Sequence, residues 1–395
     1  MLHRLIDHSP DLKKLRDEGF EIRIKSNHIL ISSIPYVNSK KEIHFGILIS
    51  TLTVAGDKTG RPDNHVAYFV GEQPCNKGGS IISALIHGQN KTVLASGIEV
   101  DRSFSNKPPK GYDDYYQKMT TYIKIISGPA QSIDDTLKAQ TYRFVESEEN
   151  ESEFNYPDTN SSRAGISTIT DKLKEQKVGI IGAGGTGSYI LDFIAKCPVK
   201  EIRIFDNDEF ILHNAFRSPG APEQEVLKQT PKKVNYLHEI YSKMHSNIIV
   251  HDKYIDDSNL DELQGLDFVF ICIDKGVIKK KIFDYLSKNN ISFIDVGMGV
   301  EISNDNSLMG LLRVTTSING NLDHITYKGR VSLSDGDDND EYSQNIQIAE
   351  LNALNASLAV IKWKKLIGFY YSADNEKHSL YSIDDNSIIN DDIET

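Results

Sequence analysis

The chain has 395 residues, of which 39% are hydrophobic and 25% charged, so its composition is that of a globular protein with two or three domains of about 150 residues each. Acidic side chains outnumber basic ones by 56 to 44, and the resulting formal net charge of −12 argues against broad binding to nucleic acid or anionic membranes. No apolar stretch approaches the ~18 residues that span a bilayer, and residues 1–15 lack the apolar core of a signal peptide.

The cysteines are few and widely spaced. Cys75, Cys197 and Cys272 form no CxxC pair, so they can build neither a disulfide framework nor a four-cysteine zinc site. We therefore expect a protein of the reducing cytoplasm without zinc.

Residues 1–146 predict a smaller α+β domain. The segment SPDLKKLRDEG has a helical spacing of leucines, with Ser9 as an N-cap and Gly19 at its end. Alternating apolar segments follow (FEIRIK, HILISSI, HFGILISTLTVAG and HVAYFVG), and each predicts a strand. Partner recognition is a possible role of this domain. The acidic, polar segment 147–162 predicts a linker.

Residues 163–395 form the third part. Short apolar runs (KVGIIGAGG, EIRIFDND, LDFVFICIDK and ISFIDVGMG) alternate with helical stretches, which is typical of a Rossmann-like, mainly parallel sheet with crossover helices. Beyond Met309 the segments LLRVTTSI and HITYKGRVSL predict strands. The acidic turn SDGDDNDE lacks the spacing of an EF-hand calcium loop, so we expect a solvated loop.

A long helix is predicted from about Glu341 onwards. Ile346, Leu351, Leu354 and Leu358 lie roughly on one face, which indicates a core helix or, alternatively, a helix at a dimer interface. The tail after it is acidic and polar.

A glycine turn carries the first indication of function. The sequence Gly182-Ala-Gly-Gly-Thr-Gly187 follows an apolar strand and precedes a helix, a pattern that brings backbone N–H groups close to a phosphate. Asp206 ends the next strand, 24 residues after Gly182, where a carboxylate can bind a ribose hydroxyl. Taken alone, these residues favour a nicotinamide-dependent oxidoreductase, with a structural turn that binds nothing as the alternative.

Further charged residues point away from hydride transfer. Asp208, Asn214 and Arg217 follow the second strand, and Lys232 and Lys233 begin a later helix. Asp274 ends a later strand, and Arg163 precedes the first strand. Ligands of parallel sheets bind at the carboxyl ends of the strands. Cations beside carboxylates at that edge suit a triphosphate with Mg²⁺ better than a dinucleotide.

These motifs together resemble the ThiF-type adenylyltransferases, which include activating enzymes of sulfur-carrier proteins and adenylation domains of ubiquitin-activating enzymes. The resemblance rests on GAGGTG, DND, HNAFR, PKKV and the strand ending in CID, and it covers roughly residues 163–300. The whole chain also resembles bacterial two-domain proteins in which an N-terminal domain of unassigned function precedes a ThiF-like domain. Those proteins occur beside ubiquitin-like and conjugating-enzyme-like partners.

The resemblance implies roles for particular residues. Gly182, Gly184, Gly185 and Gly187 would hold ATP, Asp206 its ribose, and Asp208 would line the phosphate site. Asn214, Arg217 and Lys233 would contact the triphosphate, with Lys232 as the alternative lysine, and Asp274 would bind Mg²⁺. Arg163 would reach the γ-phosphate from the second subunit of a homodimer.

The function implied by the resemblance is ATP-dependent adenylation of the C-terminal carboxylate of a ubiquitin-like protein, with hand-off to a conjugating-enzyme-like partner. A sulfur-carrier adenylyltransferase, a non-catalytic nucleotide-binding scaffold and an NAD-dependent oxidoreductase are the alternatives. Two positions depart from the family pattern. Lys275 replaces an asparagine that often follows the metal-binding aspartate. Only Cys75, in a predicted loop, is placed to act as a thioester nucleophile, and direct hand-off of the adenylate or an oxyester on a hydroxyl is favoured over it.

Overall fold

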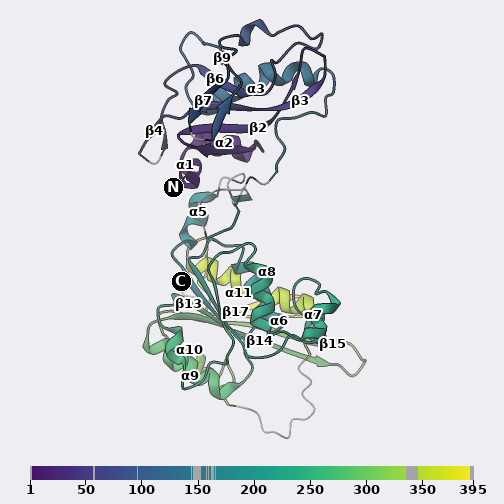
Figure 1. Cartoon of the computed structure of the whole chain (residues 1–395). Helices are drawn as coiled ribbons and strands as arrows, with labels where there is room; N and C mark the ends of the chain where they lie inside the picture. Colours follow the sequence, from purple (N-terminus) through teal and green to yellow (C-terminus); the bar gives the residue numbers. More distant parts are fainter. Residues whose placement is uncertain are drawn as a thin grey trace. The chain divides into compact units, whose positions relative to one another are not determined.

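The computed structural model describes residues 2–56, 58–95, 97–143, 145, 153–156, 158, 160–161, 164, 166–334 and 346–391. The chain folds into two compact units (Figure 1). The first comprises Met1–Ser152 with Tyr156–Gly165, and the second comprises Glu153–Asn155 with Ile166–Thr395. In the described part of the chain, no helix is both long and apolar enough to cross a membrane.

The first unit is built on an antiparallel five-stranded sheet. Its order is β1-β2-β3-β6-β9, with bounds Ile22–Lys25, His28–Val37, Ile43–Thr51, Val66–Val70 and Arg102–Ser105. Two small ribbons accompany it, β4–β5 (Val54–Ala55, Lys58–Thr59) and β7–β8 (Thr92–Ala95, Ile98–Val100). Helices α1 (Leu2–His8), α2 (Pro10–Asp17) and α3 (Tyr115–Gln131) and the short helix η1 (Ser83–Leu85) complete it. The predicted helix and strand meander are therefore confirmed.

Two local features of this unit differ from the expectation. Ser9 occupies the N-cap position of α2, but its Oγ accepts a hydrogen bond from the Thr59 backbone N–H at 2.9 Å instead of capping the helix. Helix α3 has no counterpart among the predicted elements, although Asp114 caps it by accepting from the Gln117 N–H at 2.7 Å.

The second unit contains an eight-stranded sheet in the order β12-β11-β10-β13-β14-β15-β16-β17. Pairing is parallel from β12 to β14 and antiparallel from β14 to β17. The parallel strands are β10 (Lys177–Ile181), β11 (Glu201–Phe205), β12 (Ile248–His251), β13 (Phe268–Ile271) and β14 (Ser292–Ile302). The antiparallel extension is β15 (Leu308–Ser317), β16 (His378–Ser382) and β17 (Ser387–Asp391).

Helices cover both faces of this sheet (Figure 1). Along β10, Ile180 packs with α6 (Gly185–Ile194), α8 (Lys233–Tyr241) and α11 (Ala349–Leu366), whereas its neighbour Ile181 packs with α9 (Gly276–Lys288) and α10 (Asp323–Tyr327). Successive side chains of a strand point to opposite faces, so a strand buried on both faces must be apolar throughout. The remaining short helices are α5 (Ser167–Thr170), η2 (Asp171–Leu173), η3 (Leu212–Phe216), α7 (Gln224–Gln229) and η4 (Leu260–Leu263). The predicted Rossmann-like fold is confirmed.

The C-terminal part corrects three expectations. The segment HITYKGRVSL, predicted as a strand, contains α10, and the acidic, polar tail, for which no element was predicted, contains β16 and β17. The long helix begins at Ala349, later than predicted, while its expected start at Glu341 and most of the acidic turn SDGDDNDE lie outside the described residues. The buried face of α11 is formed by Asn352, Asn355, Ala356, Ala359, Val360, Lys362 and Trp363, and the three predicted leucines are only half-buried. The helix nevertheless belongs to the core of this unit.

Candidate active site

A cavity of about 630 Å³ opens where the parallel strands end. The register pairs Ile181 with both Phe205 and Ile271, so β10, β11 and β13 end at the same level. The residues that follow these strands, Gly182, Asp206 and Cys272, all line the cavity. The chain continues to β11 on one side of β10 and to β13 on the other, which makes this edge a topological switch point, the usual place of a ligand in such sheets.

Three glycines of this turn are closely packed, and the fourth faces open space. Gly182 has a φ of +93°, and a Cβ there would lie 2.8 Å from the Cys272 carbonyl oxygen. A Cβ on Gly187 would lie 1.9 Å from the Gly182 oxygen, and one on Gly185 would lie 2.2 Å from Asn352 Nδ2. Only at Gly184 would a Cβ meet nothing within 4 Å. The turn therefore brings bare backbone to the cavity at the start of α6, where free N–H groups and the helix dipole favour an anion.

The Asp206 carboxylate accepts hydrogen bonds from residues that follow β10 and β11. Its Oδ2 accepts from the Ala183 N–H at 2.7 Å, and its Oδ1 accepts from the Asp208 N–H at 2.8 Å. The carboxylate is only 6% exposed, so its position is fixed by the backbone. Each of its oxygens keeps a further lone pair for a ligand such as a ribose hydroxyl.

The predicted lysine of the phosphate site is Lys233 rather than its neighbour. Lys233 lines the cavity, and its Nζ lies 2.5 Å from Asp208 Oδ2 and 3.9 Å from Asp206 Oδ1. Lys232 instead donates to the Asn207 carbonyl oxygen at 2.7 Å and does not line the cavity. Burial alone would raise the pKa of Asp208, but hydrogen bonds from Lys233 and Tyr254, with the charges of Lys233 and Lys275, hold it below its ordinary value.

Arg217 supplies a second cation to the same wall. It follows η3 and lines the cavity, and its Nε is buried without a hydrogen-bond partner among the described residues. Burial lowers the pKa of this guanidinium, opposed by the charge of Asp208, but a guanidinium stays charged in proteins. An anion in the cavity would give the unpartnered N–H an acceptor.

Asp274 lies after β13 at the exposed mouth of the cavity. Within the described residues, no three His, Cys, Asp or Glu side chains are grouped so as to hold a metal by themselves. Mg²⁺ is commonly held by one or two carboxylates together with substrate phosphates, so Asp274 fits an ion that arrives with a nucleotide. Lys275, where the family pattern often has asparagine, also lines the cavity, with its Nζ 5.6 Å from the centre of the Tyr254 ring.

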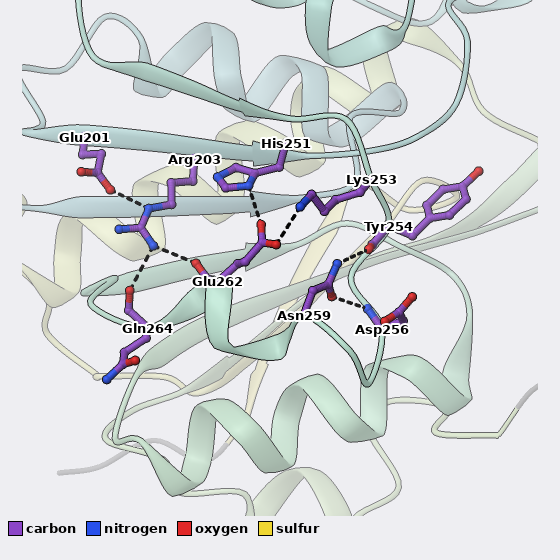
Figure 2. A network of polar contacts seen from close by, with 9 residues as sticks. All are labelled: Glu201, Arg203, His251, Lys253, Tyr254, Asp256, Asn259, Glu262 and Gln264. Carbon is purple, nitrogen blue, oxygen red and sulfur yellow. Dashed lines mark hydrogen bonds and ion pairs between the residues drawn. The ribbon is translucent and has the colours of Figure 1, made fainter.

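Tyr254 reaches the cavity from the loop after β12. Its hydroxyl donates to Asp208, and this bond is the main cause that raises the pKa of Tyr254 to about 12. Figure 2 shows how the loop is held: Asn259 Nδ2 donates to the Tyr254 carbonyl oxygen at 2.9 Å, and Asn259 Oδ1 accepts from the Asp256 N–H at 2.8 Å.

A second set of bonds ties this loop to the sheet (Figure 2). Glu262 accepts from His251 Nδ1 at 2.6 Å and from Lys253 Nζ at 2.7 Å. Arg203, on β11, donates to the backbone oxygens of Glu262 and Gln264 at 2.7 and 3.0 Å. The loop that carries Tyr254 is therefore fixed at both ends.

Several cavity residues besides Tyr254 were not predicted from the sequence. Asn352 and Asn355 reach the cavity from α11, and Lys279 reaches it from α9. Asn352 Oδ1 accepts from Thr186 Oγ1 at 2.9 Å, and Asn355 Nδ2 donates to the Gly297 oxygen at 2.9 Å. The sequence contains two signals for these cavity residues. Asn352 and Asn355, three residues apart, share a helix face with alanines and a tryptophan. Lys279 lies about one turn into the helix that follows Asp274.

Other expected site residues lie elsewhere. Asn214 is buried away from the cavity lining, where its Oδ1 accepts from the Ile211 N–H at 2.9 Å and stabilises η3. Gly187 packs behind the turn, against the Gly182 carbonyl. Arg163 lies outside the described residues.

None of the three cysteines presents an open thiol. Cys75, the proposed loop nucleophile, is fully buried, and burial raises the pKa of its thiol. Cys197 is 3% exposed. Cys272 borders the cavity, but burial and then the charge of Asp295 raise the pKa of its thiol far above its ordinary value. A thiolate is the reactive form of cysteine, so all three are poor nucleophiles.

Two family models match the chain. Residues 159–354 match the model of the ThiF family. The chain carries a ThiF family domain. Residues 10–159 match a model described as a domain of unknown function, DUF6791.

Three curated relatives each match about a third of this chain. Ubiquitin-like modifier-activating enzyme 5 of Drosophila virilis is 24% identical over 139 residues, which is 32% of this chain and 35% of that protein. tRNA threonylcarbamoyladenosine dehydratase of Haemophilus influenzae is 26% identical over 135 residues, 32% of this chain and 49% of that protein. Adenylyltransferase and sulfurtransferase UBA4 of Saccharomyces cerevisiae is 28% identical over 140 residues, 33% of this chain and 30% of that protein. The chain thus spans less than half the length of each.

Among solved structures, E. coli MccB with ATP is 20% identical, with a TM-score of 0.46, covering 59% of this chain and 69% of that chain.

Proposed function

We propose that this chain is an ATP-dependent adenylyltransferase that activates the C-terminal carboxylate of a ubiquitin-like protein. The observation that supports it most is the composition of the cavity. Four cations line the cavity (Arg217, Lys233, Lys275 and Lys279) beside the glycine turn, together with four carboxylates (Asp206, Asp208, Asp256 and Asp274). Such a site can bring two anions together, as this reaction requires.

In the proposed reaction, a carboxylate oxygen attacks the α-phosphorus of ATP in line, the bond to the bridging oxygen of the β-phosphate breaks, and pyrophosphate leaves. Asp206 would hold the ribose, while the turn, Arg217 and Lys233 would hold the phosphates. Mg²⁺, bound with ATP at Asp274, would neutralise part of the phosphate charge. Positioning and charge stabilisation suffice, because this half-reaction needs no protein nucleophile.

The accessibility and pKa of the cysteines indicate which acceptor takes the acyl group after adenylation. Because Cys75 and Cys197 are buried and the pKa of the half-buried Cys272 thiol is raised, we propose that the adenylate is handed directly to a conjugating-enzyme-like partner, with no cysteine thioester on this chain. The relative named adenylyltransferase and sulfurtransferase keeps a sulfur-carrier substrate as the second candidate. We further propose that the enzyme works in the cytoplasm as a homodimer in which Arg163 of one copy serves the other, and that the N-terminal unit recognises a partner.

The test is exchange of labelled pyrophosphate into ATP. We expect exchange to depend on ATP, Mg²⁺ and a ubiquitin-like protein encoded beside the gene of this chain, and to vanish when the tail of that protein is amidated. Asp274→Ala should abolish exchange, whereas Asp284→Ala, an exposed acidic residue of α9, should not.

Three outcomes would contradict parts of the proposal. Stabilisation by NAD(H) rather than ATP–Mg²⁺ in a thermal melt would indicate an oxidoreductase. ATP binding without exchange would indicate a scaffold. Full exchange by Asp274→Ala would remove Asp274 from the mechanism. Mass measurement in solution, with Arg163→Ala in the exchange assay, tests the homodimer.

A further inference from the structure

A cluster of three charged side chains lies on the β14 side of the cavity. Lys279 Nζ lies 3.0 Å from Asp295 Oδ1, and Arg313 Nη2 lies 2.5 Å from Asp295 Oδ2. Asp295 is fully buried, Lys279 is 5% exposed, and the Arg313 side chain is 17% exposed. The cluster joins α9, β14 and β15.

This cluster has one positive charge in excess. Within the described part of the chain, neither Lys279 nor Arg313 has another carboxylate at ion-pair distance. Arg313 Nη1 donates to Thr315 Oγ1 at 2.7 Å, and Thr315 meets His378 Nδ1 at 3.0 Å. Burial, with the charges of Arg330 and Arg313, lowers the pKa of His378 to about 4, so this histidine is neutral at pH 7. An uncompensated buried charge is unfavourable, and a bound anion would balance it.

Of the two cations, Lys279 is the one available to a ligand. Arg313 is engaged by Asp295 and Thr315. Lys279 lines the cavity, and its ammonium forms an ion pair with Asp295 Oδ1 at 3.0 Å. An ammonium has three N–H donors, so two remain for a ligand beside the one that faces Asp295.

The strand beside Lys279 carries two glycines with different surroundings. Gly297 lines the cavity, and its oxygen is held by Asn355. A Cβ at Gly297 would lie 2.6 Å from Arg313 Nη2, so the guanidinium occupies the space beside this glycine. A Cβ at Gly299, two residues further along the same face, would meet nothing within 4 Å.

Lys279 and Lys233 belong to different ion pairs of the cavity wall. Lys233, at the start of α8, pairs with Asp208 after β11, whereas Lys279 pairs with Asp295 on β14. Strands β10 and β13 lie between β11 and β14 in the sheet.

We propose that Lys279 binds the acyl substrate, first through its carboxylate and then through the carbonyl oxygen of the adenylate, while Arg217 and Lys233 bind the phosphates. This rests on the adenylation proposed above. Asp295 and Arg313 position the ammonium.

The test compares two non-hydrolysable nucleosides, 5′-O-(N-acetylglycyl-sulfamoyl)adenosine and 5′-O-sulfamoyladenosine, by calorimetry on the full chain. The wild type should bind the acylated compound at least ~10-fold more tightly, because a charged hydrogen bond is gained. Lys279→Gln should reduce this preference to within about 2-fold and leave the affinity for ATP–Mg²⁺ unchanged. Lys280→Gln, at an exposed position of the same helix, is the matched control and should keep the preference. Lys279→Arg should keep it as well.

The outcomes separate this inference from the proposed function. If the wild type prefers the acylated compound and Lys279→Gln prefers it equally, the inference is wrong while adenylation stands. If the wild type binds neither compound nor ATP, adenylation itself fails. If Lys279→Gln does not fold, Lys279→Met, which preserves the apolar stem, replaces it; loss of the preference in a folded Met variant supports the inference, and retention overturns it.

Discussion

Lys233 Nζ lies 2.5 Å from Asp208 Oδ2 and 3.9 Å from Asp206 Oδ1, so the lysine expected to bind phosphate is held between two carboxylates. Its side chain is 7% exposed, and these contacts offset the cost of burying the ammonium. A phosphate in the cavity would compete with Asp208 for the same donors. The lysine is thus preoriented at the site rather than recruited from solvent.

Replacement of this lysine should impair nucleotide binding specifically. We expect Lys233→Ala to weaken the affinity for ATP by about 10-fold or more, because a charged hydrogen bond is lost. Lys232→Ala, which removes a contact with Asn207 outside the cavity, should change it by less than about 3-fold. Calorimetric titration with ATP–Mg²⁺ measures both, and equal affinities of the two variants would show that Lys233 does not reach the phosphates.

Two glycines of one turn should respond differently to alanine. Gly187→Ala places a Cβ 1.9 Å from a backbone oxygen, and we expect it to destabilise the second unit by about 1–3 kcal/mol or more. Gly184→Ala meets nothing within 4 Å and should leave the melting temperature unchanged while reducing ATP affinity. Thermal melts with and without ATP separate the two effects. A stable Gly187→Ala protein would contradict the packing described for this turn.

The loop that carries Tyr254 should matter for binding more than for stability. Asn259→Ala removes the two bonds that close the loop, so we expect ATP affinity to fall several-fold with little change in melting temperature. Asn289→Ala, which removes a comparable exposed bond at the end of α9, is the control. Hydrogen exchange should show faster exchange in residues 252–259 of the first variant alone, and unchanged exchange would mean that Asn259 does not hold the loop.

His378 should make the second unit sensitive to acid. Its pKa is lowered to about 4 in the folded chain, against about 6.5 when unfolded, so the unfolded chain binds the extra proton first. Above pH 6.5 the histidine is neutral in both the folded and the unfolded chain. As the pH falls from 6.5 towards 4, the unfolded chain takes up the proton first and the free energy of unfolding decreases. Between pH 7 and pH 5 the melting temperature of the wild type should therefore fall more than that of His378→Gln. Parallel curves for the two proteins would show that His378 does not titrate in this way.

The thiols should react slowly in the folded protein. Titration with Ellman's reagent should give much less than one reactive thiol per chain before denaturation and three afterwards, because Cys75, Cys197 and Cys272 are buried or raised in pKa. Any acyl-enzyme trapped with the protein substrate should withstand dithiothreitol. Rapid labelling of Cys75 would restore it as a candidate nucleophile.

The sequence predicted the site best where a chemical motif lies next to a segment with the periodicity of a strand. Glycines next to an apolar strand, and acidic residues at strand ends, predicted the cavity edge because the carboxyl ends of parallel strands must meet. Lys233 was preferred to Lys232 through the family resemblance alone, since both lie at the start of one helix and the direction of each side chain decides which one lines the cavity. The strands β16 and β17 were missed because their residues are polar and half-exposed at the sheet edge.

The far wall of the cavity was missed for a different reason. Asn352 and Asn355 lie about 170 residues after the glycine turn, and no local pattern tells which face of a buried helix meets a ligand. The leucines of α11 predicted the wrong buried face because close packing on α6 and on glycine backbone selects small residues. Lys279 lies in a stretch predicted only as helical, and its partners on β14 and β15 become neighbours only through the sheet.

The contribution of α11 also bears on how the protein can be divided or synthesised. A fragment that ends after β14 would contain the glycine turn, Asp206 and Asp274 but would leave one side of the pocket open to water. During translation, the ribosome must have passed Leu366 before that side can close. Nascent or truncated chains should therefore fail to retain ATP, even though every recognisable nucleotide motif is already present in them.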